Sequence, residues 1–187
     1  MNMIEIGILQ DIQDIFQCAF LDTIMPPLTS LGNKGMIWIA LAVFLLLFKK
    51  TRRLGLAVGI ALILDLLMCD ITLKPLIARI RPFDLIEIKL LIASPHDFSF
   101  PSGHTAVSFS AVFALMFSKS KLYIPSLILA VIIAFSRLYL FVHYPSDILG
   151  GIVVGLICGF SGAFIIKRIF EYFEKKRAEN ISCTLPE

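Results

Sequence analysis

Long apolar runs separated by short polar links dominate the chain. A segment that crosses the hydrocarbon core of a bilayer as an α-helix needs roughly 20 predominantly apolar residues. Five runs meet this condition or come close to it, at about 29–48, 54–73, 101–118, 122–142 and 146–166. The pattern predicts an all-α protein, a polytopic membrane helical bundle with about five spans.

The first 24 residues follow a different pattern, in which apolar residues recur at helical spacing. They are Ile4, Ile8, Ile12, Ile15, Phe16, Ala19 and Phe20, with Glu5, Gln10, Asp11, Gln13, Asp14 and Gln17 between them. Such a stripe is typical of an amphipathic helix that lies in the membrane interface. Because four acids and no base precede Lys34, we expect this helix on the outer surface. The alternative is a polar sixth span lodged against the bundle. Pro26-Pro27 is expected to break the chain before the first span.

Composition excludes two broad classes of protein. Of the 187 residues, 58% are hydrophobic and 17% are charged, and the mean hydropathy is +0.87. A soluble domain is nearer 45–50% apolar and about 25% charged, so neither a soluble globular protein nor a disordered chain is expected. The net charge of +3 provides no broad basic face for a nucleic acid. We expect one integral-membrane domain, with an amphipathic helix at 1–27, a spanning core at 28–166 and a charged cytoplasmic tail at 167–187.

Lysine and arginine are distributed unevenly among the links, and cytoplasmic links of membrane proteins are enriched in both. The first-to-second link, the third-to-fourth link and the segment after the fifth run hold 11 of the 17 basic residues. They are Lys49, Lys50, Arg52, Arg53, Lys119, Lys121, Lys167, Arg168, Lys175, Lys176 and Arg177. These segments alternate along the chain, so we expect all three on the cytoplasmic side.

The other basic residues lie at or near the opposite side and need another explanation. Lys74 and Arg81 are seven residues apart, which places both on one face of a helix that Pro82 ends. Arg79 would point elsewhere, and Arg137 lies inside the fourth run. Membrane anchors that snorkel to the interface are the alternative for the first two cations.

Two acids interrupt the second run. A charge at membrane depth is costly, so by default it faces the bundle interior. Asp70 precedes Lys74 by four residues, the spacing of an ion pair on a helix, and it is either a structural partner or a site residue. Asp65 is deeper, and the sequence assigns it no role beyond being protonated or bonded to a neighbouring helix.

The sequence Phe100-Pro101-Ser102-Gly103-His104 opens the third run. Pro, Ser and Gly are common at helix starts, and the free backbone N–H groups there also bind anions. Capping alone explains such a segment, but a hydroxyl, a glycine that permits close approach and an imidazole also suit an oxyanion.

His143 follows the fourth run and Asp147 begins the fifth. A carboxylate can hold one imidazole nitrogen protonated and leave the other as a nucleophile or base. By the expected topology, this pair reaches the outer end of the bundle together with the other two segments. The converging residues are Lys74, Arg81, Arg137, Ser102, Gly103, His104 and His143. They predict a binding site for a tetrahedral oxyanion with two candidate imidazole catalysts.

These residues resemble the three signature motifs of the type 2 phosphatidic acid phosphatase family. The motifs are Lys74-x6-Arg81-Pro82, Pro101-Ser102-Gly103-His104 and Ser136-Arg137-x5-His143-x3-Asp147. The resemblance covers residues 55 to 166 and points to the bacterial integral-membrane branch. That branch handles phosphatidylglycerol phosphate, phosphatidate and undecaprenyl diphosphate. Many of its members have six spans, and this chain is expected to lack the first.

The resemblance implies a lipid phosphatase in the cytoplasmic membrane of a bacterium, and the expected topology places its active site on the extracytoplasmic face. It implies that His143 is the nucleophile, that Asp147 orients it and that His104 protonates the leaving oxygen. The implied phosphate ligands are Lys74, Arg81, Ser102, Gly103 and Arg137. The resemblance also implies that the reaction needs no metal or other cofactor. In agreement, the four cysteines lack the CxxC or zinc-ligand spacing of a metal site.

Several alternatives stay open at this point. A lipid phosphotransferase would use the same phosphohistidine, and a non-catalytic lipid-phosphate binder or transporter would use the same cations. Vanadium-dependent haloperoxidases belong to the resembled family, but the spans argue against that activity. The sequence names neither the lipid nor the choice between a monomer and a homodimer.

Overall fold

The computed structural model describes residues 2–182, so residue 1 and the last five residues of the predicted tail lie outside the described residues. The described chain is all-helical, as predicted. Its α-helices are α1 (Asn2–Phe16), α2 (Ala19–Leu31), α3 (Met36–Leu47), α4 (Arg52–Asp65), α5 (Lys74–Ile77), α6 (Gly103–Phe117), α7 (Tyr123–Tyr139) and α8 (Pro145–Ser182). A π-helix, Leu66–Leu73, joins α4 to α5.

Each of the five predicted apolar runs is helical, but the helices differ in length. Within the described residues, Arg52–Asp84 and Pro145–Asn180 are long and apolar enough to cross a membrane. The pair of α2 and α3, bent by 45° at its break, makes a third candidate if it counts as one span. Helices α6 and α7 are shorter apolar helices. Length and composition therefore support two or three spans, where the apolar runs alone predicted about five.

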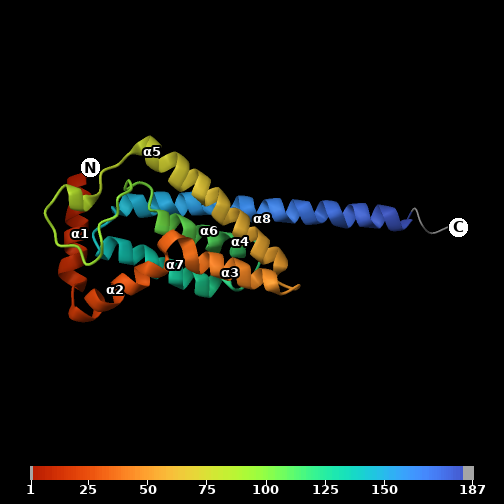
Figure 1. Cartoon of the computed structure of the whole chain (residues 1–187), viewed down its shortest axis with the longest axis horizontal. Helices are drawn as coiled ribbons and strands as arrows, with labels where there is room; N and C mark the ends of the chain where they lie inside the picture. The colour runs from red at the N-terminus through yellow and green to blue at the C-terminus, as the bar shows by residue number, and fades with distance from the viewer. Residues whose placement is uncertain (1, 183–187) are drawn as a thin grey trace.

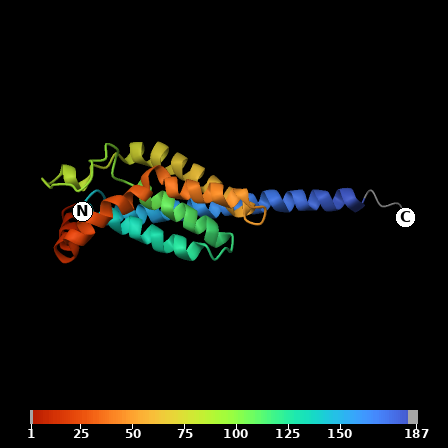
Figure 2. The ribbon, with the colours of Figure 1, turned by 60° about the horizontal axis from the view of Figure 1, so that its bottom comes forward.

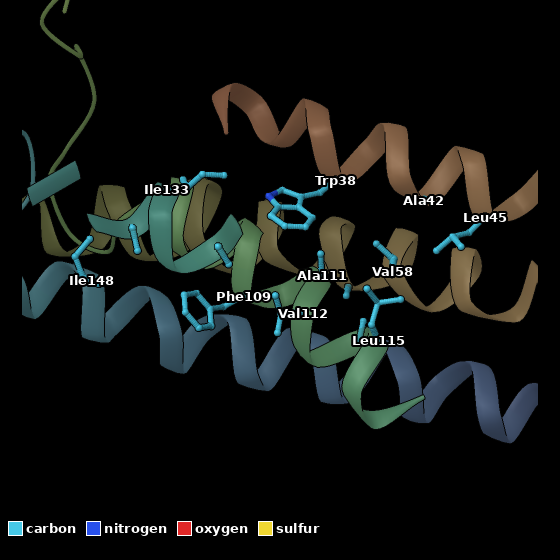
Figure 3. Close-up of a cluster of buried hydrophobic side chains, with 14 residues drawn as sticks. Trp38, Ala42, Leu45, Val58, Phe109, Ala111, Val112, Leu115, Ile133 and Ile148 are labelled. Carbon is cyan, nitrogen blue, oxygen red and sulfur yellow. The ribbon is translucent and has the colours of Figure 1, made fainter. Parts of the chain in front are cut away.

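Helix α6 lies at the centre of the bundle, between α4, α7 and α8 (Figure 3). Its buried side chains include Phe109, Val112 and Leu115, and they pack with Trp38 of α3 and Val58 of α4. The Trp38 indole N–H donates a hydrogen bond to Ser108 Oγ at 2.9 Å. The one polar atom of this large side chain is therefore satisfied inside the core.

Close packing of α8 on α6 depends on a row of glycines. A Cβ atom at Gly155 would lie 2.6 Å from Phe109 Cβ, and one at Gly159 would lie 2.6 Å from Phe113 Cβ. Small residues allow two membrane helices to approach closely. The row therefore serves packing within the bundle, and it fixes α8 against α6, which begins at Gly103.

The N-terminal segment differs from the prediction in two respects. Pro26 and Pro27 lie inside α2 and do not end it, although a proline inside a helix removes a backbone hydrogen bond and crowds the preceding turn. The chain bends later, where Lys34 (φ 51°) and Gly35 (φ 68°) adopt left-handed conformations. The single amphipathic helix predicted at 1–27 is replaced by two helices, α1 and α2, which are separated at residues 17–18.

The two ends of the bundle differ in character (Figures 1 and 2). Helix α1 runs across one end, and α8 extends beyond the other. At the end toward the α8 extension, a cavity of about 770 Å³ is lined by Lys50, Lys119 and Lys167, one from each of the three basic segments. The predicted gathering of these segments on one side is therefore confirmed as a feature of the fold.

Candidate active site

The end of the bundle near α1 contains a cavity of about 1060 Å³. Six of the eight predicted site residues line it: Lys74, Arg81, Gly103, His104, Arg137 and His143. The other two, Ser102 and Asp147, are fully buried, and the Ser102 N–H donates to the Asp147 carbonyl at 3.1 Å. Segments far apart in the sequence therefore meet at one place, as the motifs predicted.

The carboxylate of Asp147, in the first turn of α8, accepts hydrogen bonds at both of its oxygens. Its Oδ2 atom accepts hydrogen bonds from Ser99 Oγ at 2.5 Å and from the Tyr144 N–H at 2.9 Å, and it lies 3.4 Å from His143 Nδ1. Its Oδ1 atom accepts from Arg79 at 2.6 Å. Asp147 is thus a carboxylate held at both oxygens, with Oδ2 facing Nδ1 of His143.

His143 lies in the link between α7 and α8 and is 1% exposed. With Nδ1 facing Asp147, its other nitrogen, Nε2, lies 3.2 Å from Arg81 Nη1 and accepts a hydrogen bond from it. Burial lowers the pKa of this imidazole to about 3, an effect that the hydrogen bond to Asp147 opposes and the charge of Arg81 reinforces. The ring is therefore neutral at physiological pH, the state that a nucleophilic nitrogen requires.

Lys74 and Arg81 converge, but not on one continuous helix. Helix α5 ends at Ile77, and Ala78 adopts a left-handed conformation (φ 47°), so the prediction of a shared helical face is wrong. The two cations meet instead through Asp97, a residue that sequence reasoning missed. Its carboxylate lies 2.5 Å from Lys74 Nζ and 2.6 Å from Arg81 Nη2, and its carbonyl accepts from Arg81 Nε at 2.8 Å.

Arg137 lies near the end of α7 and is 3% exposed. Its Nη1 atom donates to Thr29 Oγ1 of α2 at 2.7 Å. Its Nε atom is buried and has no hydrogen-bond partner among the described residues. A buried donor without a partner is costly, and here it belongs to a guanidinium that lines the cavity, where an oxyanion would satisfy it.

The start of α6 lies against the same cations. Ser102 is the N-cap, and a Cβ atom at Gly103 would lie 3.0 Å from Lys74 Nζ. Any side chain at Gly103 would therefore occupy space next to the ammonium group. The helix begins here with free N–H groups, which favour an anion at this position.

His104 contacts a segment that the motifs do not include. Its Nε2 atom lies 3.0 Å from Asn33 Oδ1, in the bend between α2 and α3. A Cβ atom at Gly32 would lie 2.7 Å from His104 Cδ2. The bend is therefore shaped to fit this imidazole, and Asn33 is a second site residue that sequence reasoning missed.

The two acids of the second run now have partners. Asp70 Oδ1 lies 2.5 Å from Lys74 Nζ, so the predicted ion pair is present, and Asp70 also lines the cavity. Asp65 is 2% exposed and accepts a long hydrogen bond of 3.4 Å from Ser110 Oγ of α6. Among the described residues, no group of three or more His, Cys, Asp or Glu side chains is arranged to hold a metal ion.

Sequence comparison places these residues inside a known family. The model of the PAP2 superfamily matches residues 50–173 of the chain, a range that contains all eight predicted site residues. An undecaprenyl-diphosphatase of Sulfolobus acidocaldarius is 35% identical over 141 residues, covering 74% of this chain and 68% of the relative. Undecaprenyl-diphosphatase BcrC of Bacillus subtilis is 33% identical over 146 residues, covering 76% and 73%.

A solved structure agrees with this placement. The crystal structure of a transmembrane PAP2-type phosphatidylglycerolphosphate phosphatase from Bacillus subtilis has a TM-score of 0.69 with this fold at 27% identity. The match covers 91% of this chain and 86% of that one. With the family model and the curated relatives in agreement, the chain belongs to the PAP2 superfamily and is an integral-membrane phosphatase.

Proposed function

We propose that this protein hydrolyses a lipid phosphate or diphosphate through a phosphohistidine on His143, without a metal ion. The observation that carries the proposal is the placement of His143. Its Nδ1 atom faces a buried carboxylate, and its Nε2 atom lies beside Arg81 in a cavity that His104 also lines. Phosphoryl transfer depends mainly on positioning and charge stabilisation, and three cations and a helix N-terminus provide both here.

In the first step, His143 Nε2 attacks phosphorus in line. The N–P bond forms as the bond from phosphorus to the leaving oxygen breaks, and the imidazolium form of His104 gives its proton to that oxygen and becomes neutral. Asp147 stabilises the positive charge that develops on the His143 ring. Lys74, Arg81 and Arg137 hold the non-bridging oxygens, together with Ser102 and the Gly103 amide.

In the second step, water attacks the phosphohistidine. His104 accepts a proton from the water as the new P–O bond forms and the N–P bond breaks. Inorganic phosphate leaves, His143 returns to its neutral form, and His104 again carries its proton.

The cavity wall supports a lipid substrate. From the cations, the lining continues along the apolar side chains of Ile39 and Val43 on α3 and Leu62 and Ile63 on α4. A phosphate can therefore reach the cations while an acyl or prenyl tail follows the apolar wall toward the bilayer. The test is phosphate release by the purified protein in detergent from undecaprenyl diphosphate, phosphatidylglycerol phosphate and phosphatidate. Undecaprenyl diphosphate is the first substrate to test, because the relatives from Sulfolobus acidocaldarius and Bacillus subtilis are both named undecaprenyl-diphosphatases.

A transferase or a binder would give other results in this assay. Added alcohols or lipid acceptors would receive the phosphoryl group in place of water if the protein were a phosphotransferase. A protein that binds the lipids and releases no phosphate from any of them would overturn the proposed hydrolysis.

We further propose that the active site faces the extracytoplasmic side of a bacterial cell membrane. The support is the gathering of Lys50, Lys119 and Lys167 at the end of the bundle away from α1, combined with the tendency of basic links to stay in the cytoplasm. Single cysteines introduced at Lys50 and at Lys89 in a cysteine-free variant test the orientation. In sealed cells, an impermeant maleimide should label only the cysteine at position 89, and the reverse result would place the site inside.

A further inference from the structure

Helix α1, which runs across one end of the bundle (Figure 1), buries one face against the link between α7 and α8, which carries the proposed nucleophile. Ile6 is 3% exposed and Leu9 is fully buried, and both pack with Phe141 and Tyr144, which flank His143. The predicted apolar stripe lies largely on the other side of the helix, where Ile4 is 74% exposed. The face turned toward the protein therefore has a separate role.

Glu5 lies on this buried face and is 7% exposed. One of its carboxylate oxygens, Oε1, accepts a hydrogen bond from the Ser146 N–H at 2.9 Å, in the first turn of α8. The other, Oε2, lies 2.5 Å from Arg79 Nη2. Burial alone would raise the pKa of Glu5, but the hydrogen bonds from Ser146 and the charge of Arg79 outweigh it and lower the pKa. The carboxylate is therefore ionised at physiological pH.

Arg79 connects Glu5 to the proposed catalytic pair. Its Nη1 atom donates to Asp147 Oδ1 and to Ser146 Oγ, both at 2.6 Å, and its guanidinium carbon lies 3.9 Å from the centre of the Tyr144 ring. Its side chain is 13% exposed. Since Arg79 holds Oδ1 of Asp147, the Oδ2 atom is left to face His143.

The charge of Arg79 is shared between two carboxylates. If Asp147 were its sole counter-ion, the guanidinium would draw the charge of Asp147 away from His143 and weaken the stabilisation of a positively charged ring. Glu5 balances that charge from the opposite side and fixes the guanidinium in a buried position, where an unpaired charge would be costly.

We propose that Glu5 is a positioning residue of the active site, which makes helix α1 part of the catalytic apparatus. This inference rests on the proposed phosphohistidine mechanism. Glu5 acts through Arg79 and Asp147 and is not among the residues that line the phosphate cavity. Its loss should therefore slow the chemical steps at His143 and leave the binding of phosphate intact.

The test compares Glu5→Gln with Asp11→Asn. Both changes remove one negative charge from α1, but Asp11 is exposed. We expect Glu5→Gln to lower kcat and the rate of phosphoenzyme formation by roughly 10- to 100-fold, the scale of a misaligned reacting group. The inhibition constant of inorganic phosphate should change less than about twofold, and Asp11→Asn should behave as the wild type. Equal turnover of the two variants, or a parallel loss of phosphate binding in Glu5→Gln, overturns the proposal.

A second measurement separates positioning from a loosened helix. Arg79→Gln and the double variant Glu5→Gln/Arg79→Gln should have the same kcat, because the amide oxygen of Gln can still accept from the Ser146 N–H and the change removes only the ion pair with Arg79. Leu9→Ala loosens the packing of α1 without touching the ion pairs and should retain most of the turnover. Additive losses in the double variant, or a loss in Leu9→Ala equal to that of Glu5→Gln, would contradict the assignment. An inactive wild-type protein would instead overturn the proposed function itself.

Discussion

The carboxylate of Asp97 lies 2.5 Å from the ammonium group of Lys74 and 2.6 Å from Nη2 of Arg81. Two of the three cations proposed to bind phosphate are therefore already paired with a carboxylate of the protein. Burial raises the pKa of Asp97, but the hydrogen bonds and charges of Lys74 and Arg81 outweigh this effect and hold it well below its usual range. Asp97 is therefore ionised whenever the substrate is. A phosphate that approaches these cations meets a competing negative charge.

Replacement of Asp97 by Asn should strengthen phosphate binding. The change removes the competing charge and keeps a side chain of similar size, and the carboxylate is half-exposed, so we expect the inhibition constant of inorganic phosphate to fall by up to about fivefold. Competitive inhibition of lipid hydrolysis measures this constant. Asp84→Asn, in the same connecting segment, is the control. Weaker binding in Asp97→Asn would mean that this carboxylate serves chiefly to hold the cations in place.

The two histidines should respond differently to the leaving group. His143→Ala should abolish both phosphoenzyme formation and turnover. His104→Ala should lose about 10²- to 10⁴-fold on an alkyl phosphate and less on an activated aryl phosphate, whose leaving group scarcely needs a proton. Asp147→Asn should fall between the two. The measurement is rate against leaving-group pKa. Equal losses of His104→Ala on both substrates would remove it from the acid role, and turnover in His143→Ala would exclude the phosphohistidine.

Asn33 should share the leaving-group dependence of His104. Its Oδ1 atom lies 3.0 Å from His104 Nε2, so Asn33→Ala frees the imidazole to rotate. We expect a loss of roughly tenfold on an alkyl phosphate, consistent with a misplaced proton donor, and a smaller loss on an aryl phosphate. Thr23→Ala, at an exposed position of α2 that does not line the cavity, provides the control. An Asn33→Ala variant with equal losses on both substrates would indicate a structural role only.

The mechanism also predicts the response to chelators and oxyanions. The proposed phosphate ligands are side-chain cations and backbone amides, so EDTA should leave turnover unchanged. Vanadate should inhibit, because it adopts the five-coordinate geometry of the transferring phosphoryl group and such analogues bind tightly. Phosphate release in the presence of each reagent is the measurement. An enzyme inactivated by EDTA and restored by Mg²⁺ is incompatible with the proposed chemistry.

The motif residues could be located from sequence because their spacing reflects where helices begin and end. Lys74, His104 and His143 each lie close to such a boundary, and the alternation of basic links placed the three boundaries at one end of the bundle. The roles of these residues stay predictions. The number of spans stays a prediction, since a run of apolar residues does not reveal where the helix inside it starts.

The missed residues share a physical reason. Glu5 belongs to a helix whose acids look like a solvated face, and its burial arises from contacts with residues about 140 positions away along the chain. Asp97 lies in a connecting segment without periodicity, and Asn33 lies in a bend. Arg79 was expected to point away from Lys74 and Arg81 on a continuous helix that does not form, and sequence spacing gave no indication that it would reach Asp147. Contacts of this kind depend on the tertiary fold alone.

The protonation state of His143 gives a direct test of its environment. Burial lowers its pKa to about 3, below the usual value near 6.5, and a lowered pKa means that the neutral ring persists as the pH falls. Nitrogen-15 NMR of the histidine-labelled protein in detergent should therefore show His143 neutral from pH 8 down to pH 5. The variants His96→Gln and His104→Gln, each lacking one of the other two imidazoles, assign the signals. Nε2 can accept a hydrogen bond from Arg81 only when the ring is neutral. A titration of His143 near pH 6.5 would therefore contradict the buried geometry, and it would also contradict a neutral, nucleophilic ring at physiological pH.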